Sequence, residues 1–382
     1  MTYLEYNVKR MPTGLAKVVH MNWPLVLLVI AVACVGFMML YSVAGGSLQP
    51  WAEPQMKRFG LGLALMFAVA FTPLWFWRSA AGLAYALSVL LLLGVEFFGS
   101  IGMGAKRWLD LGPVRLQPSE LAKITVVMAL AAFYDWLDVK RTSHPLWVLV
   151  ALLIIVIPTL LVLRQPDLGT ALLLSGGGVF VMFVAGVSWI YFAVAIAAGG
   201  GLVTAVMASR GTDWQILRDY QYRRIDAFMD PSLDPLGAGY HISQAKIAMG
   251  SGGWSGRGLT EGTQSRLNFL PEKHTDFIFT TLAEELGFVG AISLLVLYVL
   301  IILFCAYTIM RAATRFGALL AAGVTVTFFL YFFVNMAMVM GLLPVVGVPL
   351  PLVSYGGSAM LVLLIGFGML QSAHIHCPRT RS

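Results

Sequence analysis

Ten runs of apolar residues divide this chain, and each is close to the roughly 20 residues that a helix needs to cross a bilayer. They lie at about 24–44, 59–76, 80–98, 119–137, 146–163, 168–187, 189–208, 277–310, 316–340 and 351–373. The chain is 59% hydrophobic and 11% charged, whereas about a quarter of the residues in soluble domains are charged. Because a backbone in hydrocarbon must satisfy its own hydrogen bonds, such runs form helices. We therefore expect an all-α polytopic membrane protein with ten transmembrane helices.

The polar segments between the runs predict the topology. Lys9, Arg10 and Lys17 precede the first helix, and short cytoplasmic segments of membrane proteins are enriched in Lys and Arg. Ten spans return the chain to the side on which it began. We therefore expect a cytoplasmic N-terminal segment (1–23), a single transmembrane domain (24–375) and a cytoplasmic tail (376–382). Within the transmembrane domain, a large extracytoplasmic (periplasmic) loop (209–276) is expected between the seventh and eighth helices.

The large loop contains two segments that mix aromatic, basic and aliphatic residues at helical spacing, 219–231 and 239–250. Each is predicted to be an amphipathic helix lying in the membrane interface. Between them and the eighth span lies GSGGWSGRG, residues 250–258. A loop so rich in glycine can bind a phosphate through its backbone donors, but a hinge is the simpler interpretation.

The remaining composition excludes several classes of protein. Three cysteines, with no CxxC pair, provide neither a disulfide framework nor a metal motif. The chain has no GxxxxGK[ST] loop, so ATP hydrolysis is not expected. The net charge is +7, which in a membrane protein reflects loop lysines and arginines facing anionic lipid. Membrane lipid is therefore an expected partner, and nucleic acid is not.

The segment LPEKHTDFIF, residues 270–279, places Asp276 where the large loop enters an apolar helix. A carboxylate at the edge of hydrocarbon is costly, so such residues are commonly functional. Glu272, Lys273 and His274 add a charged and ring-bearing cluster beside it. The segment alone is consistent with a helix cap, a topology anchor or a reaction centre.

Two further clusters lie at predicted helix starts. In QPSELAK, Glu120 falls in the first helical turn, where a negative charge suits the helix dipole, and Lys123 follows one turn later. In RQPDLGTAL, Asp167 follows a proline at another helix start. A capped helix with a local ion pair is the simpler interpretation of the first cluster, but Lys123 extends into the apolar zone, where an unpaired ammonium is costly, and this favours function. Capping alone explains Asp167 about as well as function does.

A stretch of prolines and glycines precedes the last helix, PVVGVPLPLVSYGGSAM at residues 344–360. These residues interrupt helix geometry. Non-helical backbone at membrane depth is tolerated only where it lines a cavity or is buried in protein. The stretch is therefore predicted to be re-entrant and to line the same pocket as the polar clusters.

These motifs carry a resemblance to a known family. GAKRWLDLG, QPSELAK, QPDLGTAL, GYHISQAKIAMGSGG, LPEKHTDFIF with EELGF, and PLPLVSYGGSAM occur in the order found in the shape, elongation, division and sporulation (SEDS) proteins. The resemblance covers residues 24–375. The loop sequence GTQSRLNFLPEKHTDF is similar to that of the elongation branch of the family rather than that of the division branch.

The resemblance implies a glycosyltransferase that polymerises lipid II into peptidoglycan outside the cytoplasmic (inner) membrane. The essential aspartate of the family matches Asp276. Other motif positions match Arg107, Trp108, Glu120, Lys123 and Asp167, which are expected to bind substrate together with Glu272 and His274. The expected partners are lipid II, the nascent glycan strand and a class B penicillin-binding transpeptidase.

The implied chemistry joins an α-linked donor into a β-1,4 linkage, which one inverting displacement achieves. Such a step needs one general base for the acceptor hydroxyl, and we assign it to Asp276. Lys123, Arg107 or a bound divalent cation (Mg²⁺ or Mn²⁺) is a candidate for neutralising the leaving pyrophosphate. The alternatives are a lipid II flippase or transporter, a division-type polymerase, and a non-catalytic scaffold.

Overall fold

The computed structural model describes residues 12, 14, 16–102, 105–110, 115–212, 214–216, 222, 226, 229, 238–267 and 272–376. Within them lie ten helices of 17 residues or more, each overlapping one predicted apolar run. They are α2 (Trp23–Val43), α3 (Ala52–Phe71), α4 (Leu74–Phe98), α5 (Pro118–Trp136), α6 (Pro145–Arg164), α7 (Leu168–Val184), α8 (Trp189–Ala208), α12 (Ile278–Arg311), α13 (Arg315–Val339) and α14 (Gly357–Ile375). The helical fold class is therefore confirmed.

Seven of the described helices are long and apolar enough to cross a membrane, namely α2, α4, α6, α8, α12, α13 and α14. α7 is apolar but has only 17 residues. α3 and α5 carry charged side chains in their first two turns, which lowers their hydropathy: Glu53, Lys57 and Arg58, and Glu120 and Lys123. The chain is a multi-pass membrane protein.

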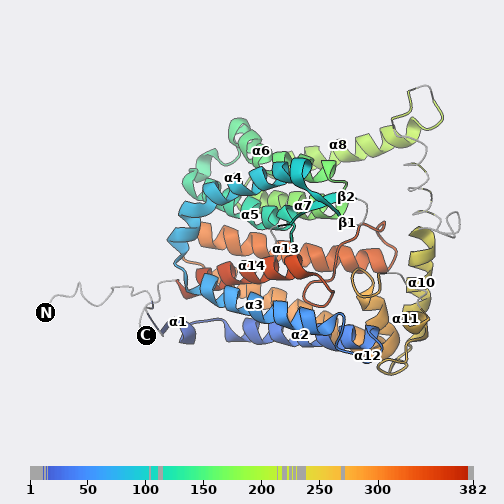
Figure 1. The fold of residues 1–382 in the computed structure, drawn as a ribbon. Coiled ribbons are helices and arrows are strands. Elements are labelled where there is room, and N and C mark those ends of the chain that lie inside the picture. The colour runs from blue at the N-terminus through green and yellow to red at the C-terminus, as the bar shows by residue number, and fades with distance from the viewer. Residues whose placement is uncertain are drawn as a thin grey trace.

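The long helices lie side by side, with α13 and α14 near the centre of the bundle (Figure 1). Most side chains of these two helices are buried. α8 lies at the edge, and none of its 20 residues is buried. The short helix α1 (Ala16–Val19) lies at one end of the bundle, whereas α10 (Ala238–Ser251) and α11 (Thr263–Arg266) lie at the other. A 3₁₀ turn, η2 (Val139–Arg141), joins α5 to α6.

The connection between α4 and α5 holds a small antiparallel sheet that the sequence did not predict. Its strands are β1 (Ser100–Gly102), β2 (Ala105–Asp110) and β3 (Arg115–Leu116), in that order. Strands of two to six residues are too short to show the alternation that identifies a strand. The all-α prediction is therefore incomplete in this connection.

α12 is broken at Gly287, where φ is 65° and ψ is −162°. The glycine-rich loop 252–258 lies against the break and exchanges backbone hydrogen bonds with it. The N–H groups of Arg257 and Gly258 donate to Glu284 and Glu285 at 3.1 and 3.0 Å, and those of Phe288 and Val289 donate to Gly253 and Trp254 at 2.9 and 3.2 Å. Two loop donors that a phosphate would need are thus used in packing.

The two buried glutamates beside this break hold neighbouring segments. The Glu284 carboxylate accepts the Thr263 hydroxyl at 3.0 Å and the Gln264 N–H at 2.9 Å, at the start of α11. The Glu285 carboxylate accepts the hydroxyl of Ser42 near the end of α2. Because a buried carboxylate is costly unless hydrogen-bonded, these contacts tie α2 and α11 to the first half of α12.

The last helix begins later than predicted. The expected helix at 351–373 instead starts at Gly357, and residues 344–356 are non-helical. Prolines 349 and 351 lack the backbone N–H that a helix interior requires. Val348, Leu350 and Val353 in this stretch are buried, so the predicted re-entrant character of the segment is supported.

The predictions for the large loop have mixed outcomes. The predicted helix at 239–250 is confirmed as α10. The predicted helix at 219–231 lies outside the described residues, apart from 222, 226 and 229.

Replacing Gly256 by alanine is expected to destabilise the protein. An added Cβ would lie 2.1 Å from the Glu285 carbonyl oxygen, and φ is +79°. A strained backbone position of this kind costs about 1–3 kcal/mol. Thermal unfolding of the purified protein in detergent measures the effect. The control is Gly94→Ala, where an added Cβ has nothing within 4 Å; it should unfold at the wild-type temperature or above. Equal midpoints for the two variants would contradict the packing of the loop on α12.

Candidate active site

The segment 272–277, which leads into α12, is held in place by hydrogen bonds that other segments donate to its backbone carbonyl groups. Three successive carbonyl groups accept hydrogen bonds: His274 from the Tyr355 N–H at 2.9 Å, Thr275 from the Ser354 hydroxyl at 2.5 Å, and Asp276 from the Asn335 amide at 2.9 Å. Each bond fixes one peptide plane. The backbone around Asp276 is therefore fixed relative to α13 and to the 344–356 loop.

The Asp276 side chain is partly buried. Burial raises its pKa from the ordinary 3.8 to about 6, and the negative charge of Glu272 adds to the shift. Gly347 of the 344–356 loop faces the carboxylate: a Cβ there would lie 3.6 Å from Oδ2. The φ of Gly347 is +71°, which L side chains rarely adopt. At this point the loop therefore presents a residue without a side chain to the Asp276 carboxylate.

His274 belongs to an aromatic group that the sequence analysis missed. Its ring stacks on Trp51, which immediately precedes α3, with centroids 3.9 Å apart and planes at 18°. Trp51 also meets Tyr355 edge to face at 5.0 Å, and the Arg58 guanidinium lies 5.0 Å from the Tyr355 ring centroid. Burial lowers the pKa of His274 below its usual 6.5. The imidazole is therefore neutral at pH 7.

Glu272 is the most exposed of the predicted residues in this segment. Its φ is +54°, and its carboxylate accepts the Thr275 hydroxyl at 2.9 Å. The His274 Nε2 atom lies 3.9 Å from the same carboxylate oxygen. The structure thus brings together the predicted Glu272, His274 and Asp276.

Glu120 and Lys123 form a buried pair on α5, with Oε1 and Nζ 2.7 Å apart. The side chains are only 6% and 2% exposed. Tyr331 of α13 completes the cluster: its hydroxyl donates to Glu120 Oε2 at 2.6 Å and accepts from Lys123. The predicted ion pair is therefore present, and a tyrosine that no local motif identified satisfies both of its members.

Asp167 caps α7, as the simpler interpretation of the sequence proposed. Its carboxylate accepts the Thr170 N–H at 3.1 Å and the Thr170 hydroxyl at 3.0 Å. The Gln117 side chain, at the start of α5, also donates to it at 3.3 Å. This last contact joins Asp167 to the helix that carries Glu120 and Lys123.

Arg107 of β2 lies against the junction of α6 and α7. Its guanidinium donates to the Gln165 carbonyl at 3.0 Å and the Pro166 carbonyl at 2.5 Å. Both of these acceptors are neutral carbonyl groups. Trp108 follows on the same strand and is partly buried, and its carbonyl accepts the Ser100 hydroxyl at 3.2 Å.

The 344–356 loop contacts both groups of predicted residues. A Cβ on Gly347 would lie 3.6 Å from the Asp276 carboxylate, and a Cβ on Gly169 of α7 would lie 2.6 Å from the Val346 carbonyl oxygen. The loop therefore packs against both the Asp276 segment and the first turn of α7, which Asp167 caps.

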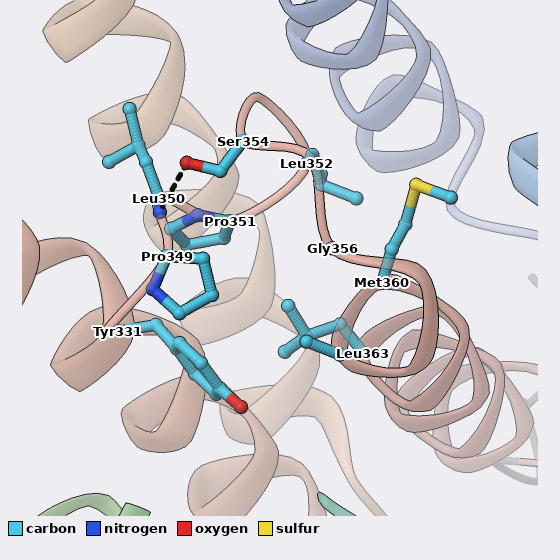
Figure 2. Close-up of a pocket in the computed structure, with 10 residues that line it drawn as sticks. Tyr331, Pro349, Leu350, Pro351, Leu352, Ser354, Gly356, Met360 and Leu363 are labelled. Carbon is cyan, nitrogen blue, oxygen red and sulfur yellow. Dashed lines mark hydrogen bonds between the residues drawn. The ribbon is translucent and has the colours of Figure 1, made fainter. Parts of the chain in front are cut away.

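A small pocket lies under the second half of this loop (Figure 2). Its lining comprises Tyr331, Pro349, Leu350, Pro351, Leu352, Ser354, Gly356, Ala359, Met360 and Leu363. Figure 2 shows Tyr331 and Ser354 on opposite sides of it, with the Ser354 hydroxyl accepting the Leu350 N–H at 2.8 Å. A pocket so small and apolar suits the packing of the loop rather than a lipid-linked sugar.

Within the part of the chain that the structure describes, no group of three His, Cys, Asp or Glu side chains is close enough to hold a metal ion. A Mg²⁺ ion commonly needs only one or two protein carboxylates when substrate phosphates complete its coordination. The carboxylates of Asp276 and Glu272 are of the kind that such an ion uses.

Comparison with known proteins identifies the family. The family model for FtsW, RodA and SpoVE, described as cell cycle protein, matches residues 22–378. The chain is 45% identical to the peptidoglycan glycosyltransferase MrdB of Escherichia coli K12, with 94% of each chain covered. It is 35% identical to the probable peptidoglycan glycosyltransferase FtsW of Thiomicrospira cyclica, over 91% of this chain and 89% of that protein.

Two solved structures agree with this assignment. RodA of Thermus thermophilus, a rod shape determining protein, matches with a TM-score of 0.70 and 29% identity, covering 94% of this chain and 98% of that one. A chain from work on polymerization and crosslinking by a peptidoglycan synthase complex matches with a TM-score of 0.81 and 32% identity, covering 93% and 97%. The chain therefore belongs to the SEDS family, the group of cell cycle proteins that includes FtsW, RodA and SpoVE.

Proposed function

We propose that this chain is a peptidoglycan glycosyltransferase of the elongation type, which polymerises lipid II into β-1,4-linked glycan strands. The similarity to MrdB and RodA over nearly the whole chain supports the activity and the branch of the family. The observation that carries the mechanism is Asp276, a partly buried carboxyl group with a pKa of about 6 on a fixed backbone. A general base works best when its pKa is close to the working pH.

In the proposed step, Asp276 takes the proton of the acceptor sugar's 4-hydroxyl as that oxygen bonds to the donor's anomeric carbon. The bond from that carbon to the pyrophosphate oxygen breaks, and undecaprenyl pyrophosphate leaves with the electron pair. One displacement inverts the α-linked donor to the β-linked product. Gly347, which faces the Asp276 carboxylate, has no side chain to block the approach of the acceptor hydroxyl from that side.

The negative charge that develops on the pyrophosphate needs a positive partner. Arg107 is the better placed of the two predicted cations, because it is partly exposed and its hydrogen bonds go to neutral carbonyls. Lys123 is buried and already paired with Glu120, so its role is to orient Glu120. Mg²⁺ or Mn²⁺ is a further candidate for neutralising the pyrophosphate. Trp108, Asp167, Glu272 and His274 are proposed to contact the substrates.

The proposal includes ten spans, with both termini in the cytoplasm and the active site facing the periplasm. The seven apolar helices would be completed by α3, α5 and α7. The position of α1 at the end of the bundle opposite α10 and α11 supports placing the 209–276 loop away from the N-terminal segment (Figure 1). The domain division is the one expected from the sequence: residues 1–23, 24–375 and 376–382.

A class B penicillin-binding transpeptidase is the proposed protein partner. The match to a chain of a peptidoglycan synthase complex supports such an assembly, since cross-linking of new strands needs a second enzyme beside the polymerase. Membrane lipid, lipid II and the growing strand are the other proposed partners. A lipid II flippase is the main alternative, and it would require polar side chains along a path through the membrane.

Replacing Asp276 by asparagine is expected to lower the polymerisation rate at least about a hundredfold, because loss of a general base typically costs 10²–10⁴. The measurement is gel analysis of glycan strands made from lipid II by the purified protein with its partner, in the presence of moenomycin. The control is Asp138→Asn, which removes an exposed carboxylate at the start of η2. An Asp276 variant as active as wild type would reject the base assignment. A wild-type protein that forms no strands but moves lipid II across vesicles would favour the flippase.

The rate should also depend on pH in a defined direction. A base must be deprotonated to act, and burial raises the pKa of Asp276 from 3.8 to about 6. The rate is therefore expected to rise with pH to a plateau above about 6, with its acid limb near that value. Initial rates measured from pH 4.5 to pH 8 at lipid II concentrations well below KM, which report the pKa of the substrate-free enzyme, test this expectation. An acid limb near the ordinary aspartate value would contradict the proposed burial of the base.

A further inference from the structure

Two polar side chains of α13, Tyr331 and Asn335, contact the two halves of the candidate site. They are four residues apart, so they lie on the same face of the helix, separated by about 6 Å along its axis. Tyr331 is 2% exposed and Asn335 is 0% exposed. Both occur within an apolar run, where a polar side chain is costly unless its partners compensate.

Asn335 bridges the two segments that flank the Asp276 carboxylate. Its amide nitrogen donates to the Asp276 carbonyl at 2.9 Å and to the Val348 carbonyl at 2.7 Å. Val348 follows Gly347, the residue that faces the carboxylate. One side chain therefore sets the distance between the proposed base and the loop beside it.

The Asn335 contact differs from the other two that hold this segment. The donors to His274 and Thr275 come from Tyr355 and Ser354, which lie in the non-helical loop. Of these three donors, Asn335 alone lies in a helix. Asn335 therefore fixes Asp276 relative to the central helix α13, whereas the other two donors fix the segment relative to a loop.

Tyr331 connects the buried Glu120–Lys123 ion pair to the same helix, α13. Its hydroxyl donates to Glu120 and accepts from Lys123, so it contacts both charged groups. The ammonium group of Lys123 also lies 4.3 Å from the centroid of the Tyr331 ring. The two α5 side chains are thus fixed by one residue of α13.

We propose that Asn335 and Tyr331 are positioning residues for glycosyl transfer, which together fix Asp276 relative to the Glu120–Lys123 pair. The inference rests on the proposed function of Asp276. A displacement of about 1 Å in a catalytic group can cost a hundredfold in rate. Attachment of both Asp276 and the Glu120–Lys123 pair to one rigid helix is therefore expected to increase kcat. Neither residue needs to touch substrate for this effect.

Asn335→Leu keeps the branched shape of the side chain, with a larger volume, and removes both donated hydrogen bonds. The expected result is a fall in kcat of roughly tenfold to a hundredfold, with KM for lipid II within about twofold of wild type. The matched control is Thr327→Val, which removes a buried hydrogen bond to the Gly323 carbonyl on the same helix and should retain the wild-type kcat.

The pH profile separates positioning from a loss of folded protein. In Asn335→Leu the Asp276 turn loses its helical contact and admits water, so the acid limb should move from about 6 toward the ordinary 3.8. A variant that merely folds less well would give a lower plateau with the limb unchanged. The other titratable groups of the surrounding segments, which the substitution leaves in place, are Glu272, Lys273, His274, Tyr331 and Tyr355.

Tyr331→Phe tests the second half of the proposal, since it removes only the hydroxyl. The expected result is again a reduced kcat with little change in KM. Tyr134→Phe is the control, because the buried Tyr134 hydroxyl has no hydrogen-bond partner in the described structure, and its removal should leave the rate unchanged.

The outcomes are distinguishable from failure of the proposed function. If wild type is active, Asp276→Asn is inactive, and both α13 variants keep the wild-type kcat and acid limb, the positioning role is wrong and the base assignment stands. If Asp276→Asn is as active as wild type, the base assignment fails first. A raised KM with unchanged kcat would also overturn the proposal, because it would indicate substrate binding instead.

Discussion

The candidate site depends on the hydrogen bonds that the backbone carbonyl groups of residues 274 to 276 accept from neighbouring segments. A carboxylate next to an apolar helix would otherwise turn toward water, where it is best solvated. With its backbone fixed by donors from Asn335, Ser354 and Tyr355, Asp276 remains partly buried. This burial, together with the negative charge of Glu272, raises the pKa of Asp276.

The sequence predicted the members of the site better than the contacts among them. Asp276, Glu120 and Lys123 stand in local patterns that chemistry can interpret: a charge at a membrane entrance and an ion pair one turn apart. Tyr331 and Asn335 reach partners 211 and 59 residues away, and no local pattern encodes such distances. A signal was present, because an asparagine within an apolar run is unusual, but the sequence does not say which group it meets.

The fold shows the same division between local and distant information. Apolar runs located every long helix that the structure describes, since a run of about 20 apolar residues has few alternatives in a bilayer. It did not predict the pairing of loop 252–258 with the broken α12, which depends on backbones approaching too closely for any Cβ at Gly252 or Gly256. The glycines that suggested phosphate binding in the sequence instead permit this contact, and the buried Glu284 and Glu285 complete it.

Gly347 has a consequence for the variation that the 344–356 loop can accept. The constraint on this residue is its backbone angle of +71°, because an added Cβ would meet the Asp276 carboxylate oxygen only at an ordinary contact distance of 3.6 Å. A side chain at this position therefore costs backbone strain rather than a clash, and trimming a neighbouring side chain cannot remove that cost. Tolerance to mutation cannot be judged here from contacts alone.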